Sequence, residues 1–147
     1  MKQIDVPIKV LDPELLPPAY AKAGDAGADL RSRIDILLEP GQRALIPTGL
    51  ALALPEGYVG LVHPRSGLAA KHGISIVNAP GTVDSGYRGE IMVCLLNTDR
   101  SESFQVRRGD RIAQLVIQTY VQASFRPVEQ LEESQRGASG FGSSGLA

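Results

Sequence analysis

The chain has few of the residues that carry disulfide or transition-metal chemistry. Its 147 residues include one cysteine, two histidines and no tryptophan. A single cysteine, Cys94, excludes an internal disulfide, and its place in an apolar run predicts a small buried side chain in a reducing compartment. His63 and His72 offer no metal-ligand spacing, so we interpret each as structural and expect no tightly held transition metal.

Low net charge and short apolar runs argue against nucleic-acid and membrane partners. The formal net charge is -1 at pH 7, so no overall basic field attracts DNA or RNA. The longest apolar run, residues 91–96, is far shorter than the roughly 20 residues of a membrane-spanning helix. Asp5 and Pro7 interrupt the N-terminal segment and make it a poor secretion signal. We therefore expect a cytoplasmic protein.

Abundant turn-forming residues favour an all-β fold. The chain holds 16 glycines and 10 prolines, many of them between short β-branched runs. This spacing is typical of a β sandwich, jelly roll or barrel. The predicted strands cover residues 4–9, 34–38, 43–47, 50–54, 58–63, 74–77, 91–97, 103–106 and 112–121.

One short helix is predicted over residues 66–72, with Ser66 as its N-cap and Gly73 as its stop. Arg65 directly precedes this helix. Free N–H groups at a helix start and a guanidinium both bind phosphate, so Arg65 and Ser66 are candidate phosphate ligands. The structural alternatives are a surface ion pair for Arg65 and a plain capping role for Ser66.

The polar insert at residues 78–90 is the most informative segment of the chain. It separates two apolar β-rich runs, whereas a plain hairpin needs only about two to five loop residues. Asp84 and Tyr87 lie there among three glycines, which let the backbone bend sharply and approach a ligand closely. This pattern predicts a catalytic base and a stacking platform. The alternative is an ordinary long turn with a solvated aspartate.

Two further polar positions give weaker signals. Asp29 follows small residues that let a ligand or another chain come near, although a turn or strand-end aspartate is the simpler interpretation. Gln114 alternates with apolar neighbours, so it can point into a site or to solvent, and taken alone the pattern favours solvent. Near it, Asp110 and Arg111 are expected to form a structural pair.

The composition changes near the C-terminus. Residues 128–135 are acidic and predict a loop or a brief helix, and the following segment is rich in glycine and serine. We predict a β domain over residues 1–135 and a flexible tail over residues 136–147. Within the tail, Arg136 can hold a terminal phosphate and Phe141 can stack on a base; the alternative is a disordered terminus.

Those two anchors are too few to order the tail alone. Fixing ten residues costs roughly 1–2 kcal/mol each. A charged hydrogen bond returns about 1.5–3 kcal/mol and a stacked base about 1–3 kcal/mol. Backbone contacts to phosphate and packing on a neighbouring surface must therefore supply the rest.

Taken together and in this order, five segments resemble the motifs of the trimeric dUTPases (deoxyuridine triphosphatases), over nearly the whole chain. The resemblance implies a jelly-roll-like β fold, a homotrimer whose three sites are shared between chains, and hydrolysis of dUTP to dUMP and pyrophosphate with Mg²⁺. The matching segments are Ala26-Gly-Ala-Asp-Leu-Arg-Ser32, Pro64-Arg-Ser-Gly67, Gly81-Thr-Val-Asp-Ser-Gly-Tyr-Arg-Gly-Glu-Ile91, Gly109-Asp-Arg-Ile-Ala-Gln114 and Arg136-Gly-Ala-Ser-Gly-Phe-Gly-Ser-Ser-Gly145.

The resemblance also implies a role for each site residue. Asp84, Asp29 and Gln114 would be catalytic: Asp84 deprotonates the attacking water, Asp29 acts through metal-bound water, and Gln114 binds the phosphate chain. Mg²⁺ would be held mainly by the substrate phosphates and water, with no direct protein ligand. The implied substrate-binding residues are Arg65, Ser66 and Gly67 on the phosphates, Asn78, Gly81 and Val83 on uracil, Tyr87 on the sugar, Arg136 on the γ-phosphate and Phe141 over the base.

Three other functions are open to the same fold. A dCTP deaminase would release ammonia, but the hairpin with its acid and ring favours the triphosphatase, because deamination needs chemistry at position 4 of the base. A non-catalytic nucleotide-sensing trimer would bind dUTP without turnover. A purely structural jelly roll would have no nucleotide affinity.

Overall fold

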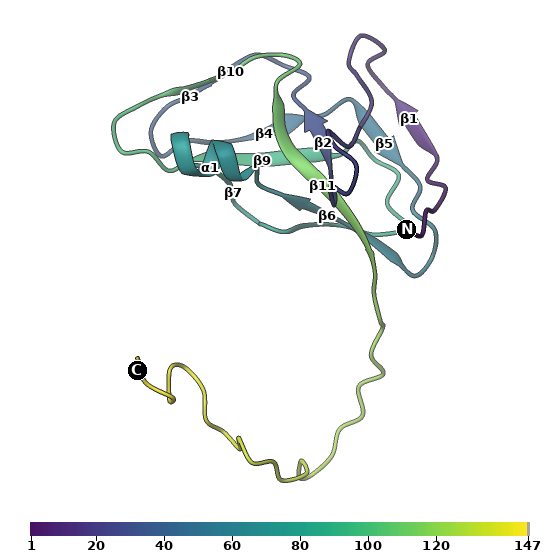
Figure 1. Cartoon of the computed structure of the whole chain (residues 1–147), viewed down its shortest axis with the longest axis vertical. Helices are drawn as coiled ribbons and strands as arrows, with labels where there is room; N and C mark the ends of the chain where they lie inside the picture. Colours follow the sequence, from purple (N-terminus) through teal and green to yellow (C-terminus); the bar gives the residue numbers. More distant parts are fainter. Residues whose placement is uncertain (147) are drawn as a thin grey trace.

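The computed structural model describes residues 1–146 and is mostly β-strand with one short helix (Figure 1). The helix, α1 (Ser66–His72), follows β6. The strands are β1 (Ile8–Val10), β2 (Gly27–Arg31), β3 (Ile36–Leu38), β4 (Arg43–Pro47), β5 (Leu50–Leu52), β6 (Tyr58–His63), β7 (Ile74–Ile76), β8 (Gly81–Val83), β9 (Met92–Asn97), β10 (Phe104–Val106) and β11 (Arg111–Thr119).

All strand pairs are antiparallel, as the jelly-roll prediction requires. One sheet has the order β2-β11-β6-β8 and another the order β4-β9-β7, while β1-β5 and β10-β3 form two-stranded sheets. The two larger sheets share one apolar core, to which Leu30, Val62 and Leu115 contribute from the first and Ile46 and Val93 from the second. The prediction of a jelly-roll-like, all-β fold is confirmed.

Two strands were missed by the sequence pattern, and one predicted strand is largely wrong. β2 has no β-branched residue, and β8 has only three residues and lies inside the glycine-rich polar insert, so neither stands out as a strand; pairing with β11 and with β6 makes them strands. The strand predicted over residues 4–9 is reduced to β1, because only Ile8–Val10 find a partner, in β5.

The helix has the predicted bounds but not the predicted cap. Gly73 ends it in the left-handed conformation at φ 65°, and its N–H bonds the carbonyls of Leu68 and Ala69. Arg65, not Ser66, occupies the N-cap position, and no side chain caps the helix. The capping prediction for Ser66 is therefore wrong, and its exposed hydroxyl is not used in a cap.

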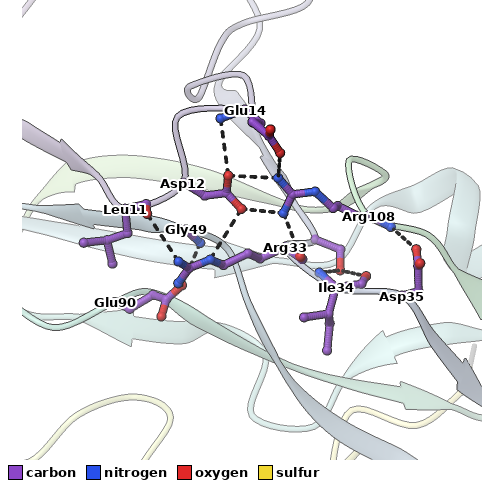
Figure 2. A network of polar contacts seen from close by, with 10 residues as sticks. Leu11, Asp12, Glu14, Arg33, Ile34, Asp35, Gly49, Glu90 and Arg108 are labelled. Atoms are coloured by element: carbon purple, nitrogen blue, oxygen red, sulfur yellow. Dashed lines mark hydrogen bonds and ion pairs between the residues drawn. The ribbon is translucent and has the colours of Figure 1, made fainter.

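A network of charged side chains joins loops that lie far apart in the sequence (Figure 2). At its centre the buried Asp12 accepts hydrogen bonds from both terminal nitrogens of Arg108, one of them 2.9 Å long. Arg33 approaches Asp12 to 3.5 Å and places its Nη1 atom 3.2 Å from Glu90 Oε1. The network therefore holds the chain after β2, the turn before β11 and the far end of the polar hairpin against the loop around Asp12.

After Thr119 the chain leaves the sheets and runs away from them (Figure 1). The described residues beyond this point are almost all exposed, including Val121, Phe125 and Leu131. The predicted boundary at residue 135 falls inside this extended segment, and the last residue of the predicted tail, 147, lies outside the described residues. Among residues 1–146, no helix combines the length and apolar character needed to cross a bilayer.

The buried Asp12 carboxylate should make the free energy of unfolding depend on pH in the acidic range. Its hydrogen bonds from Arg108 lower its pKa to about 2, from an ordinary value of 3.8. The pKa of Asp12 is lower in the folded protein than in the unfolded chain. The stabilisation by its ionised form is therefore complete above the pKa of the unfolded chain and is lost as pH falls towards about 2. The free energy of unfolding of the wild type, from urea titrations, should therefore fall more between about pH 5 and about pH 3 than that of Asp12→Asn. Equal losses in both proteins would contradict this assignment.

Candidate active site

An open pocket of about 290 Å³ lies where β2, β11 and the end of β6 meet the start of α1. The strand register explains its composition. Gln114 on β11 lies opposite Asp29 on β2 and opposite His63 on β6, and Arg65 and Ser66 follow β6 after one residue. Three of the five predicted segments thus meet in one chain. The lining residues are Ala21, Asp25, Ala26, Gly27, Asp29, Arg65, Ser66, Gly67, Arg111 and Gln114.

Asp29 lies between two guanidinium groups. Its Oδ1 is 3.7 Å from Arg65 Nε, and its Oδ2 is 3.3 Å from Arg111 Nη1. It occupies the middle of β2, so the interpretation as a turn or strand-end aspartate is wrong. The predicted pair of Asp110 with Arg111 is also wrong, because the Asp110 carboxylate instead accepts the backbone N–H of Arg107. Asp29 thus holds two guanidinium groups near each other.

Sequence reasoning missed two charged pocket residues, Asp25 and Arg111. In a regular strand, positions 111 and 114 face opposite sides of the sheet, because side chains alternate with period two. A register irregularity between Arg111 and Ala113 breaks this alternation, and both Arg111 and Gln114 line the pocket. The only available signal was the position of Arg111 within the fourth motif.

Gln114 does not face solvent, so that expectation is wrong. Its side chain is half-buried, and its Nε2 donates a hydrogen bond of 2.9 Å to the carbonyl of Pro64. The Gln114 side chain passes over Gly27 of the neighbouring strand β2. A Cβ added at Gly27 would lie 2.1 Å from Gln114 Oε1. The glycine at position 27 therefore gives this amide the space to reach the segment that carries Arg65.

The hairpin residues lie at the other edge of the same sheet. β8 carries Gly81 and Val83 and is separated from β11 by β6, and no hairpin residue lines the pocket. Gly81 and Val83 are buried, whereas Asn78 and Asp84 are exposed. One chain therefore holds its candidate site residues in two separate groups.

The Tyr87 ring is 45% exposed and makes one defined polar contact. Its hydroxyl donates a hydrogen bond of 2.8 Å to the backbone carbonyl of Glu90. The backbone N–H of Tyr87 donates to the carbonyl of Asp84 at 3.1 Å, which closes a turn that holds the acid and the ring together. The predicted base and stacking platform thus share one tight segment.

The tail residues contribute nothing to the pocket of their own chain. Arg136 Nε bonds the carbonyl of Ser139 at 3.0 Å, and Phe141 is fully exposed. Figure 1 shows this part of the chain far from the sheets. Any role for Arg136 and Phe141 requires the tail to dock on another surface.

The donor set of the pocket suits a metal that arrives with its ligand. Among residues 1–146, no three or more His, Cys, Asp or Glu side chains are grouped as a metal site. The pocket carboxylates are those of Asp25 and Asp29. Mg²⁺ prefers oxygen ligands, keeps several waters and is commonly bound by one or two carboxylates together with substrate phosphates. These residues fit that mode of binding.

Comparison with known proteins agrees with this arrangement. The dUTPase family model matches residues 15–145. The deoxyuridine 5'-triphosphate nucleotidohydrolase of Thermobifida fusca is 59% identical over 142 residues, which are 97% of this chain and 79% of that protein. The corresponding protein of Bifidobacterium longum is 60% identical over 146 residues, covering 97% of this chain and 91% of that one.

Solved structures show the same fold. The dUTPase of Staphylococcus bacteriophage 80alpha, solved with dUpNHpp, superposes with a TM-score of 0.90 at 32% identity, covering 98% of this chain and 100% of that chain. A mutant dUTPase from phage phi11 of S. aureus, described for its structural Mg(II) ion, gives a TM-score of 0.81 at 28% identity, over 88% and 100% of the two chains. With this pocket, this fold and these relatives, the chain belongs to the dUTPase family.

Proposed function

We propose that the chain hydrolyses dUTP to dUMP and pyrophosphate by in-line attack of water on the α-phosphorus. The observation that carries this proposal is the meeting of three motif segments in one pocket, with Asp29 between Arg65 and Arg111. Family membership and relatives named as dUTP nucleotidohydrolases support the same activity. A deaminase on this fold is less well supported, since these relatives are named for hydrolysis of the triphosphate.

The pocket residues supply the binding site for the phosphate chain. Arg65, Ser66 and Gly67 lie at the entrance of α1, and the exposed Ser66 hydroxyl is free of a capping role. Gln114 and Arg111 approach from β11 and extend the donor set. Such donors position the phosphates and stabilise the charge that develops during transfer.

Asp29 is the carboxylate suited to hold Mg²⁺ through water. Its oxygens already interact with Arg65 and Arg111, which leaves an outer, water-mediated contact as the fitting mode. When bound, the ion neutralises charge on the phosphates. The same carboxylate keeps the two guanidiniums in place before substrate arrives.

Asp84 is the proposed general base. Its exposed carboxylate lies in the turn that ends at Tyr87. It takes a proton from water while the water oxygen forms a bond to the α-phosphorus, and the bond from that phosphorus to the pyrophosphate oxygen breaks. Positioning and charge stabilisation do the remaining work.

A complete site requires more than one copy of the chain. The hairpin of Asp84 and the pocket of Asp29 lie at opposite edges of one sheet, so a neighbouring copy is the natural source of the missing group. The β4-β9-β7 sheet carries Leu45 and Met92 with exposures of 60% and 36%, and Val77, directly after β7, is 51% exposed. Exposed apolar residues gathered in this way are typical of a subunit contact and support the proposed homotrimer.

Base selection follows from the hairpin backbone. Backbone groups around Asn78, Gly81 and Val83 can match O2, N3–H and O4 of uracil. Cytosine reverses the pattern at N3 and position 4 and would leave polar groups unpaired, at about 1–3 kcal/mol each. A narrow hairpin excludes the thymine methyl group, and Phe141 from a docked tail covers the base.

Sugar selection is assigned to Tyr87. A ring packed on the deoxyribose leaves no space for a 2′-hydroxyl and rejects UTP. Arg136 from the tail holds the γ-phosphate. No nucleic-acid or membrane partner is proposed, and the cytoplasmic location stays a prediction.

Product analysis tests the proposed activity. The full-length protein is incubated with Mg²⁺ and, separately, dUTP, dCTP, dTTP and UTP in H₂¹⁸O. We expect turnover of dUTP alone, with the heavy oxygen in dUMP, because water attacks the α-phosphorus. Heavy oxygen only in pyrophosphate would refute this mechanism, ammonia from dCTP would favour a deaminase, and tight dUTP binding without turnover would favour a sensor.

Replacing the proposed base should separate chemistry from binding. Asp84→Asn keeps the size of the side chain and removes its basicity, so kcat for dUTP should fall at least ~100-fold while substrate affinity is largely kept. Asp5→Asn, at an exposed position outside both groups of site residues, is the matched control. Turnover of Asp84→Asn at the wild-type rate would remove Asp84 as the base.

Truncation after Gln135 should leave a folded trimer with poor activity. The described tail residues do not contact the sheets, so the melting temperature should hardly change. Loss of the contacts from Arg136 and Phe141 should lower kcat/KM by about 10-fold or more, since a charged hydrogen bond and a stacked base each contribute more than about 1 kcal/mol. Wild-type kcat/KM in a truncated trimer would show that the tail is not a lid.

A further inference from the structure

The Tyr87 ring is folded back on its own hairpin. Besides its hydrogen bond to the Glu90 carbonyl, the ring covers Gly89 so closely that an added Cβ there would lie 2.5 Å from Tyr87 Oη and 2.7 Å from Cζ. Real side chains do not approach so closely, so any residue other than glycine at position 89 displaces the ring. The position of the ring is thus coupled to the two residues that end the hairpin.

Glu90 is itself fastened to the body of the protein. Its Oε1 accepts the backbone N–H of Gly49 at 2.8 Å and the Arg33 guanidinium at 3.2 Å (Figure 2). Ile91, the next residue, donates to the Leu50 carbonyl at 2.7 Å, and its own carbonyl accepts the Thr48 hydroxyl at 2.7 Å. The end of the hairpin is therefore locked against the turn at residues 48–50.

Arg33 has little freedom to move. Its Nη2 donates to the carbonyl of Leu11 at 3.2 Å, its Nε lies 3.5 Å from the buried Asp12, and its carbonyl accepts a bond of 3.1 Å from Arg108. Figure 2 shows its guanidinium between Asp12 and Glu90. A continuous set of contacts therefore leads from the buried network to the Tyr87 ring.

We propose that Gly89, Glu90 and Arg33 are positioning residues that hold the Tyr87 ring where it selects deoxyribose over ribose. They act through Tyr87, and the inference rests on its proposed role at the sugar. The Tyr87 ring excludes a 2′-hydroxyl only when the ring is held in place. A displacement of a positioned group by about 1 Å can lower the rate about 10²-fold. Glycine at position 89 leaves room for the Tyr87 ring. The Arg33–Glu90–Gly49 contacts hold the Glu90 backbone carbonyl, which accepts the Tyr87 hydroxyl, in place.

The first test compares two glycines of the same hairpin by the ratio of kcat/KM for dUTP to that for UTP. Gly89→Ala displaces the ring and should lower this ratio by about 10-fold or more. Gly86→Ala is the matched control, because a Cβ there meets nothing within 4 Å; its ratio should stay within about twofold of wild type. Equal ratios in the two folded variants would overturn the role of Gly89.

The second test compares substitutions at Glu90, which holds the end of the hairpin, by the same ratio of kcat/KM for dUTP to that for UTP. Glu90→Ala removes the acceptor and should lower the ratio, whereas Glu90→Gln keeps an oxygen for both bonds and should preserve most of it. Leu38→Ala removes a fully buried core side chain on β3, outside the Arg33–Glu90 network, so its melting temperature should fall while its ratio stays near wild type. A fall in the ratio of Leu38→Ala that matches that of Glu90→Ala would show a general loss of stability and overturn the proposal.

Two variants of the tyrosine separate failure of this inference from failure of the proposed function. Tyr87→Ala should lower the ratio most, and Tyr87→Phe, which loses only the bond to Glu90, should lower it less. If Tyr87→Ala keeps the wild-type ratio, the proposed role of Tyr87 fails. If Tyr87→Ala lowers the ratio but neither Gly89→Ala nor Glu90→Ala does, only the positioning role fails and the dUTPase activity stands.

Discussion

Strand β11 is hydrogen-bonded on both sides, to β2 and to β6, and this pairing assembles the pocket around Asp29. It places Gln114 between Asp29 and His63, although these residues are far apart in the sequence. A shift of one residue in either register would turn Gln114 to the other face of the sheet. The buried Leu30, Val62 and Leu115 on the same three strands oppose such a shift, because they would lose their place in the core. The apolar core thus specifies the geometry of the polar pocket.

The charged network around Asp12 supplies a second constraint. A buried ion pair is not in itself good evidence for stability, because desolvation offsets much of the attraction. Its geometric effect is clearer: Arg33 and Arg108 connect the chain after β2, the turn before β11 and the end of the hairpin. Each of these segments adjoins a motif of the site. We interpret the network as a frame that keeps the motif-bearing loops in register with the rigid sheets.

The hairpin and the pocket lie apart within one chain, and this separation bears on the exposed residues of the hairpin and of the C-terminal segment. The exposed Asp84 and the half-exposed Tyr87 lie apart from the pocket, and the extended C-terminal segment carries Phe125 and Leu131 into solvent. The entropy cost of ordering the tail requires a neighbouring surface. The proposed homotrimer accounts for all three observations, because each copy would offer a pocket, a hairpin and a tail to its neighbours.

Local sequence patterns determined the all-β class, the helix over residues 66–72 and strands such as β4 and β6, because side-chain periodicity and turn residues act within a few positions. The ordered motifs indicated the family and its candidate residues. Tertiary structure alone decided that β2 and β8 are strands, that Arg111 joins the pocket through a register irregularity, and that Gln114 bonds Pro64. It also decided that Glu90 is clamped by Arg33. These contacts depend on which distant strands and loops become neighbours, and no local pattern carries that information.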